Sequence, residues 1–151
     1  MSTKLIAKNK IALFDYDIEY TLICWIKLTW YEVKSLKTQS VSLQEAYIVL
    51  HNNRTQIINF SIPLYAKTNL WHIWSYDPDK TRDILITKRE IIKLYTAIHK
   101  TWLKAIPLEI YFNERNLIKI KVWVWKLRKK YDKKQLLKER DINKQLRYHL
   151  L

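Results

Sequence analysis

The chain of 151 residues contains no glycine. Glycine-rich phosphate loops, the G-x-G-x-x-G dinucleotide turn, the G-x-S-x-G nucleophile elbow and the G-X-X-G loop of KH domains all need backbone freedom or close approach that only glycine provides. None of these motifs is therefore present in its usual form. The turns must instead use asparagine, aspartate and the three prolines, which tolerate turn geometry at some cost.

Cysteine is nearly absent as well, because Cys24 is the single one and lies in an apolar run. A single cysteine excludes an intramolecular disulfide and a cysteine-based metal site, and it agrees with a reducing compartment. The four histidines, His51, His72, His99 and His149, are dispersed without H-x-x-x-H spacing. We therefore expect no metal centre.

Long apolar segments are also missing. The most apolar run, residues 22–30, is interrupted by Lys27, and the first ten residues lack the apolar core of a signal peptide. We expect a protein that is neither secreted nor inserted in a membrane, and that works in the cytoplasm or in an organellar matrix or nucleoid. A hydrophobic content of 48% in a chain of this length predicts one folded domain.

Positive charge is what the chain has in excess. Lysine and arginine number 28 against 14 aspartates and glutamates, which gives a formal net charge of +14. Such an imbalance favours a polyanionic partner, with nucleic acid, RNA or DNA, as the first candidate and an anionic membrane surface as the second. A low-GC coding bias would also raise lysine, together with isoleucine, asparagine and tyrosine.

Residues 117–131, with the sequence LIKIKVWVWKLRKKY, carry the clearest functional pattern. If this segment is a strand, its side chains alternate between two faces. One face is apolar core: Ile118, Ile120, Val122 and Val124. The other face combines ammonium groups with large rings: Lys119, Lys121, Trp123 and Trp125. Charge for phosphates and flat rings for bases are the two components of a groove for single-stranded nucleic acid. The alternative is that the C-terminal helix covers both tryptophans.

We expect an α+β fold with a mainly antiparallel sheet and two or three helices. Residues 1–10 are predicted to form a basic N-terminal arm, residues 11–126 the core domain, and residues 127–151 a basic C-terminal helix that packs on the core or extends from it. Alternation of apolar residues favours a strand hairpin over residues 11–34, turning at residues 15–19. A helix fits the same stretch almost as well.

The sequence of residues 42–62 is compatible with two structures. Ser42 and Glu45 have the spacing of a capping box, which predicts a helix to about Leu50. In the alternative, residues 46–51 pair with residues 56–62 across an Asn-Asn turn as a hairpin.

Thr87 and Glu90 form a second capping box, which predicts a helix that Pro107 ends. Its expected buried stripe is Ile91, Leu94, Tyr95, Ile98 and Trp102. Its opposite face carries a basic ridge: Arg89, Lys93, Lys100 and Lys104. A hairpin through residues 113–116 then leads into the strand at 117.

The candidate nucleic-acid-binding residues are therefore the basic and aromatic ones of this second half. They comprise the α-helical ridge just described and the strand with its basic extension: Lys119, Lys121, Trp123, Trp125, Lys126, Arg128, Lys129 and Lys130. Neutralising several phosphates with such residues would make binding strongly salt-dependent.

A catalytic alternative rests on Glu32 and Lys34. Their E-x-K spacing resembles the strand end of the PD-(D/E)xK nuclease superfamily, in which the carboxylate holds Mg²⁺ and the lysine steadies the attacking water. A second acid is needed, and Asp15 and Asp17 are the candidates. In a hairpin that turns near Ile18 they lie far from Glu32. Asp15 and Asp17 also resemble the D-x-D strand end of haloacid-dehalogenase phosphatases, without the threonine and glycine that follow there.

The sequence thus favours a nucleic-acid-binding protein rather than an enzyme, and no cofactor is expected. One alternative is a small Mg²⁺-dependent nuclease of a mobile element. Another is a structural subunit of a ribonucleoprotein or phage-related assembly, with protein partners as well as RNA.

Overall fold

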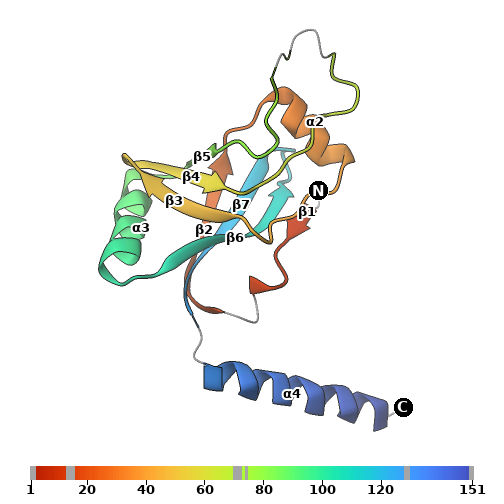
Figure 1. Cartoon of the computed structure of the whole chain (residues 1–151), viewed down its shortest axis with the longest axis vertical. Helices are drawn as coiled ribbons and strands as arrows, with labels where there is room; N and C mark the ends of the chain where they lie inside the picture. Colours follow the sequence, from red (N-terminus) through yellow and green to blue (C-terminus); the bar gives the residue numbers. More distant parts are fainter. Residues whose placement is uncertain (1–2, 13–15, 70–72, 74, 128–129, 150–151) are drawn as a thin grey trace.

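The computed structural model describes residues 3–12, 16–69, 73, 75–127 and 130–149 (Figure 1). Its elements in chain order are β1 Lys4–Lys8, β2 Tyr16–Ile26, α2 Trp30–Thr38, β3 Tyr47–His51, β4 Arg54–Ile58, β5 Arg82–Leu85, α3 Lys88–Lys100, β6 Lys104–Phe112, β7 Ile118–Leu127 and α4 Lys130–His149. All described strand pairs are antiparallel. The expected α+β class with a mainly antiparallel sheet is confirmed.

The seven-stranded sheet closes on itself. Its strand order is β1-β6-β3-β4-β5-β2-β7, and β6 also pairs with β7, so the strands from β6 round to β7 form a barrel. Closure removes the unpaired edges that an open sheet would expose. β1 extends the same sheet by pairing with β6, from Lys4 opposite Phe112 to Lys8 opposite Glu109. Residues 4–8, expected in a basic arm, therefore belong to the sheet.

Alternating residues of neighbouring strands fill the barrel. Leu22 and Cys24 of β2 lie opposite Val122 and Ile120 of β7, and all four side chains are buried. Each buried aliphatic side chain of this size contributes about 1.5–3 kcal/mol. The alternation that predicted the core side of the strand at residues 117–131 is confirmed at the β7 positions.

The hairpin alternative for the middle of the chain is confirmed. β3 and β4 pair from Tyr47 opposite Ile58 to His51 opposite Arg54. The two turn residues, Asn52 and Asn53, have φ values of 47° and 60°, which matches the left-handed geometry of a tight hairpin without glycine.

The helix predicted from Ser42 is wrong. The Ser42 hydroxyl accepts a hydrogen bond from the Gln44 amide at 3.3 Å, which closes only a local turn. From Tyr47 the chain enters β3, and Ala46 and Ile48 are buried. Packing of these residues in the sheet overrides the local helix signal.

The strand predicted over residues 11–34 is wrong at both of its ends. Residues 16–19 lie within β2, which pairs with β5 and β7 rather than with a preceding strand, so they do not turn a hairpin. Beyond Ile26 the chain enters α2, which starts after Thr29. Thr29 and Glu32 form a capping box there, a helix signal that the strand interpretation passed over.

The second predicted capping box is confirmed at the start of α3. The Glu90 amide donates to Thr87 Oγ1 at 3.3 Å, and Glu90 Oε2 accepts from the Thr87 amide at 2.8 Å. α3 ends at Lys100, not at Pro107, which lies buried within β6 beside a register shift. Leu94 is buried as predicted.

Two members of the predicted buried stripe of α3 are exposed. Tyr95 is 48% exposed and Trp102, which lies beyond the helix end, is 86% exposed. Ala97 is the second buried residue of the helix instead. The fully buried part of α3 is therefore narrower than predicted and consists of Leu94 and Ala97.

The final hairpin is confirmed between β6 and β7, which pair from Lys104 opposite Trp125 to Phe112 opposite Ile118. α4 follows and lies apart from the barrel in Figure 1. Its described side chains are exposed, including Leu137 at 54% and Ile142 at 55%. None of the helices in the described ranges is long and apolar enough to cross a membrane.

Candidate nucleic-acid interface

The two tryptophans of β7 are not a stacking surface. Trp123 is 6% exposed and Trp125 is 5% exposed, and both belong to a second buried cluster with Ala12, Ile106 and Leu108. The prediction that these rings face bases is therefore wrong. These rings are covered by Ile106 and Leu108 of β6 and by Ala12, which precedes β2, rather than by the C-terminal helix. Ala12 lies about a hundred positions away in the sequence, and strand alternation does not reveal such a contact.

Two of the three lysines of β7, Lys119 and Lys121, are half-buried and already have partners. Lys119 Nζ lies 4.6 Å from the centroid of the Trp25 ring. Lys121 Nζ lies 3.8 Å from Glu109 Oε2, and the same carboxylate pairs with Lys8 at 2.9 Å. Lys119 is thus the β7 cation whose charge stands beside an aromatic ring rather than a carboxylate.

The exposed ring on this side of the barrel is Trp25. Trp25 is 41% exposed, with Ile23 at 56% on the same strand and Leu85 at 55% on β5. Leu85 lies opposite Trp25 on one side, while Lys119 lies opposite it on the other. Side chains directly opposite in an antiparallel pair share one face. We call Ile23, Trp25, Leu85, Lys119 and Lys121 the outer patch.

Sequence reasoning missed the outer patch, although a signal was present. The same alternation that buries Leu22, Cys24 and Ile26 must turn Ile23 and Trp25 to the opposite face. Large apolar side chains at these outward positions are what distinguishes the patch from an ordinary solvated strand face.

The predicted ridge of α3 is divided between two elements. Arg89, Lys93 and Lys100 are exposed on α3, while Lys104 is the first residue of β6. Lys93 Nζ lies 4.0 Å from the centroid of the Tyr20 ring on β2. One continuous helical ridge of four cations is therefore wrong, because α3 ends before Lys104.

The basic extension of β7 falls partly on the described residues. Lys126 is exposed and pairs in the β7 register with Asp17 of β2. Arg128 and Lys129 lie outside the described residues, and Lys130 opens α4. The helix predicted over residues 127–151 corresponds to α4, which is described from Lys130, and Leu127 is the last residue of β7.

Glu32 is a structural carboxylate in this arrangement. It lies at the third position of α2 and not at a strand end, which the nuclease resemblance requires. It accepts hydrogen bonds from the Thr29 amide at 2.8 Å and from Arg82 Nε at 2.8 Å, and Lys80 Nζ lies 3.2 Å away. Burial alone would raise the pKa of Glu32, but the Thr29 hydrogen bonds and Arg82 outweigh it and lower that pKa below its usual value.

The other proposed catalytic residues do not join Glu32. Lys34 is exposed on α2, Asp17 lies on β2, and Asp15 is outside the described residues. Over the ranges that the structure describes, no group of three or more His, Cys, Asp or Glu side chains is arranged to hold a metal ion. The geometry gives the nuclease alternative no support.

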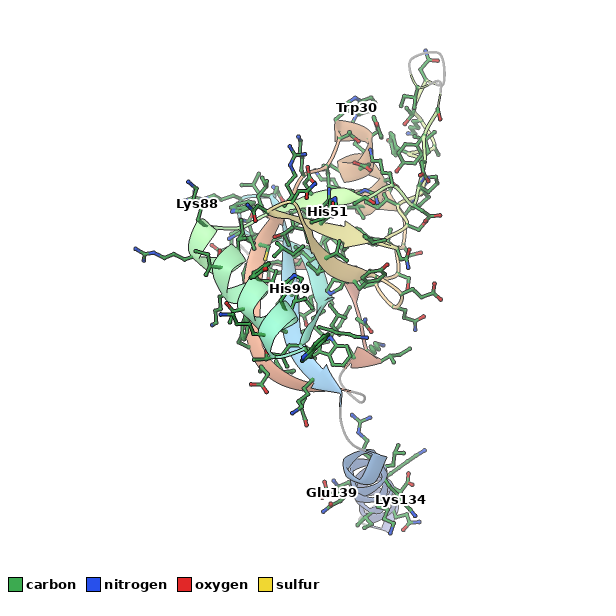
Figure 2. All side chains as sticks on the ribbon, turned by 60° about the vertical axis from the view of Figure 1, so that its left-hand side comes forward. Trp30, His51, Lys88, His99, Lys134 and Glu139 are labelled. Atoms are coloured by element: carbon green, nitrogen blue, oxygen red, sulfur yellow. The ribbon has the colours of Figure 1, made fainter. Side chains whose placement is uncertain are left out.

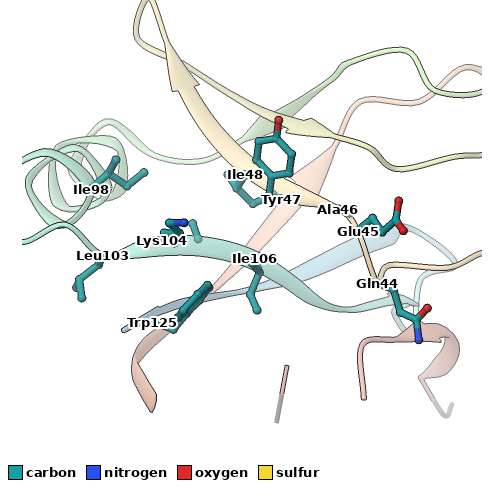
Figure 3. A pocket seen from close by; sticks show the side chains of 11 residues that line it. Gln44, Glu45, Ala46, Tyr47, Ile48, Ile98, Leu103, Lys104, Ile106 and Trp125 are labelled. Carbon is teal, nitrogen blue, oxygen red and sulfur yellow. The ribbon is translucent and has the colours of Figure 1, made fainter. Parts of the chain in front are cut away.

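A groove of about 470 Å³ opens where β3, the end of α3 and β6 meet. Figure 3 shows Tyr47 and Ile48 on one side of it, Ile98 on the helix, and the Trp125 ring beneath β6. The lining is mainly apolar, with Lys104 as its cation. Glu45 is the one acidic residue in this lining, which contains no histidine.

A small closed antiparallel barrel with an aromatic and basic outer face belongs to a class of scaffolds that nucleic-acid-binding proteins use. Residues 6–150 match the family described as SmpB protein. The chain belongs to the SmpB family.

Similar proteins from different bacteria carry one description. The SsrA-binding protein of Thermosipho melanesiensis is 37% identical over 147 residues, which cover 97% of this chain and 98% of that protein. The SsrA-binding protein of Coprothermobacter proteolyticus is 38% identical over 144 residues, 95% of each chain. A solved structure described as "tmRNA-SmpB: a journey to the center of the bacterial ribosome" is similar with a TM-score of 0.64 at 29% identity, covering 82% of this chain and 84% of that one.

Proposed function

We propose that this protein binds SsrA RNA, the tmRNA, and acts with it on the bacterial ribosome. The observation that carries the proposal is its similarity, over nearly its whole length, to proteins described as SsrA-binding. The similar solved structure adds the ribosome to the description. The bacterial ribosome is cytoplasmic, so this partner agrees with the predicted cytoplasmic location.

The outer patch is the part of the barrel we propose for the RNA contact. Trp25 offers an exposed ring, and Lys119 holds a positive charge 4.6 Å from its centroid. Stacking of a base on an exposed aromatic ring contributes about 1–3 kcal/mol. Ile23 and Leu85 extend the apolar surface on which a sugar or base can rest. Base stacking, first expected of Trp123 and Trp125, is thus assigned to Trp25.

The remaining cations serve phosphate neutralisation in this proposal. They lie on α3, on β6 and at the end of β7 with its extension: Arg89, Lys93, Lys100, Lys104, Lys126, Arg128, Lys129 and Lys130. Each phosphate neutralised releases a counterion, so affinity falls as salt rises. A net charge of +14 supports such a long-range attraction to RNA.

A titration of labelled SsrA RNA with the full chain tests the proposal. A structured RNA of equal length and unrelated sequence is the control, and both are measured over a series of salt concentrations. We expect tighter binding to SsrA RNA and a log–log salt slope of roughly −3 or steeper, as about four phosphate contacts produce. Equal affinity for both RNAs, or a flat salt dependence, would contradict the proposal.

A further inference from the structure

One side of α3 carries apolar and aromatic side chains that the barrel does not cover. Ile92 is 67% exposed, Tyr95 is 48% exposed, and His99 is exposed one turn further on. These positions are i, i+3 and i+7, which lie along one side of a helix. The rings of Tyr95 and His99 contact each other, with centroids 4.4 Å apart. Figure 2 shows Lys88 at the start of α3 and His99 near its end. We call Ile92, Tyr95 and His99 the α3 row.

An exposed indole stands just beyond the end of the helix. Trp102 is 86% exposed, and its φ of 54° lies in the left-handed region, which is unfavourable for a residue with a Cβ. The Leu103 amide donates to the Ala97 carbonyl oxygen at 3.0 Å and closes the helix end around Trp102. A tryptophan that is held in this conformation and left in water is typical of an anchor residue at an interface.

The groove at the meeting point of β3, α3 and β6 adjoins this end of the helix. Ile98 of α3 and Leu103, the residue after Trp102, line it together with Lys104. Figure 3 shows these three lining residues at one end of the groove and Glu45 at the other. Its volume of about 470 Å³ has room for apolar side chains of a partner. The α3 row, Trp102 and the groove therefore form one uncovered and mainly apolar surface.

We infer that this surface docks an acidic amphipathic helix of a protein partner. A helix that packs along the α3 row meets Ile92, Tyr95 and His99 at the spacing of a coiled-coil seam, while one of its apolar side chains enters the groove. Carboxylates on that helix pair with Lys88 at the start of α3 and with Lys104 at the groove. The inference does not depend on the proposed function, and this surface shares no residue with the outer patch.

Charge favours an acidic partner over a second copy of this chain or over α4. Arg89, Lys93 and Lys100 are exposed on the flank of α3 beside the row, so the potential around the row is positive. A second copy would bring two such surfaces together, each on a chain with a net charge of +14. Residues 130–149, which form α4, contain seven lysines and arginines against three aspartates and glutamates, so this helix is repelled as well.

Shape favours a protein over RNA as the occupant. A base stacked on Tyr95 or Trp102 would leave the Ile92 side chain and the groove without a partner. The groove is lined by aliphatic side chains and the Trp125 ring, a surface that a leucine or phenylalanine side chain fills better than a nucleotide does. The flank cations of α3 stay accessible to phosphates in such a complex, because they point about 100° away from the row.

A model peptide tests the docking surface on the full-length protein. The probe is a fluorescent peptide of about three heptads, with leucine at the seam positions and glutamates beside them that keep the peptide monomeric by repulsion. A peptide with the same leucines and with lysine in place of glutamate is its control. Ile92→Ser and Trp102→Ala remove the docking side chains. Ile142→Ser and Trp30→Ala are the matched control variants, because Ile142 on α4 is 55% exposed and Trp30 on α2 is 58% exposed. Circular dichroism checks that each variant is folded.

We expect the parent protein to bind the glutamate peptide saturably, and the dissociation constant to rise by about fivefold or more in Ile92→Ser and in Trp102→Ala. The matched control variants should stay within about twofold of the parent, and the lysine peptide should bind about tenfold more weakly. Amide NMR signals that shift during the titration should belong to residues 88–104 and 44–48. Parent-like affinity in both docking variants, or equal affinity for the two peptides, would overturn the inference.

Two further measurements decide between the occupants. Ile92→Ser and Trp102→Ala should bind SsrA RNA as tightly as the parent protein does. A loss of RNA affinity in both variants, without peptide binding by the parent, would assign the surface to RNA and contradict the inference. Self-association of the parent protein in sedimentation, abolished by Ile92→Ser, would assign it to a second copy instead. If the parent protein fails to prefer SsrA RNA, the proposed function is overturned, while the peptide titration still decides for or against the docking surface.

Discussion

Arg82 Nε lies 2.8 Å from Glu32 Oε1, and both side chains are 1% exposed. The guanidinium also donates to the carbonyl oxygens of Phe60 at 2.6 Å, Lys80 at 3.0 Å and Pro78 at 2.9 Å. One arginine thereby joins α2, the end of the β3–β4 hairpin region and the loop before β5. Glu32, which the sequence offered together with Lys34 as part of a nuclease site, instead connects these segments through its ion pair with Arg82.

Removing one partner of this pair should cost much of the protein's stability. Glu32→Ala leaves the Arg82 charge buried without its carboxylate, and a loss of about 3–5 kcal/mol in the free energy of unfolding is expected. Urea denaturation measures it. Lys80→Ala is the matched control: its side chain is 34% exposed and pairs with the same carboxylate, so its loss should be below about 1 kcal/mol. Equal losses in both variants would contradict this assignment.

The same carboxylate should make stability depend on acid. The pKa of Glu32 is lowered from 4.5 in the folded protein, so the unfolded chain takes up the proton first as the pH falls. Its stabilising contribution is complete above about pH 4.5 and is lost as the pH falls through the folded pKa. Unfolding free energies measured from pH 7 to pH 3 should therefore fall less steeply in Glu32→Gln than in the parent protein. Parallel curves would show that Glu32 does not titrate in this way.

Trp102 occupies a backbone conformation that suits glycine. Its φ is 54°, just beyond α3, where the Leu103 amide returns to the Ala97 carbonyl at 3.0 Å. A left-handed conformation costs a residue with a Cβ about 1–2 kcal/mol. Replacement by glycine removes this cost but recovers only part of it as stability, because glycine also makes the unfolded chain more flexible. Because Trp102 is 86% exposed, little packing is lost, and Trp102→Gly should stabilise the protein by about 0.5–1 kcal/mol in thermal unfolding. Trp102→Ala keeps the Cβ and should gain less. A less stable glycine variant would contradict the assignment of strain.

Cys24 should be chemically silent in the folded protein. It is 2% exposed, and burial, with a smaller contribution from Glu90, raises the pKa of its thiol to about 12. The thiolate is the reactive form, so a thiol reagent at pH 8 should label the chain only after denaturant is added. Labelling of the native protein at the rate of free cysteine would show that β2 opens readily.

Sequence patterns predicted the parts of the fold that depend on a few neighbouring residues. The Thr87 capping box, the Asn52-Asn53 hairpin and the core side of β7 needed only a few neighbouring residues, and all three are confirmed. The Ser42 box shows the limit of this reasoning, since the same signal is overridden when the residues beyond it enter a sheet.

The candidate site depended on contacts that are remote in sequence. Whether Trp123 or Trp25 faces solvent is decided by Ala12, Ile106 and Leu108, which cover one face of β7 and leave β2 uncovered. Alternation assigns residues to two faces, but it does not say which face a distant segment covers. The positive charge was readable from composition, whereas the position of the exposed ring was not.

The most direct test of the proposed interface is the affinity of SsrA RNA for a Trp25→Ala, Lys119→Gln double variant compared with the parent protein. Both residues reach the exposed side of the barrel, so the variant should fold, which thermal unfolding verifies. If the outer patch holds the RNA, the dissociation constant should rise by about tenfold or more. An unchanged dissociation constant in a folded double variant would contradict the account.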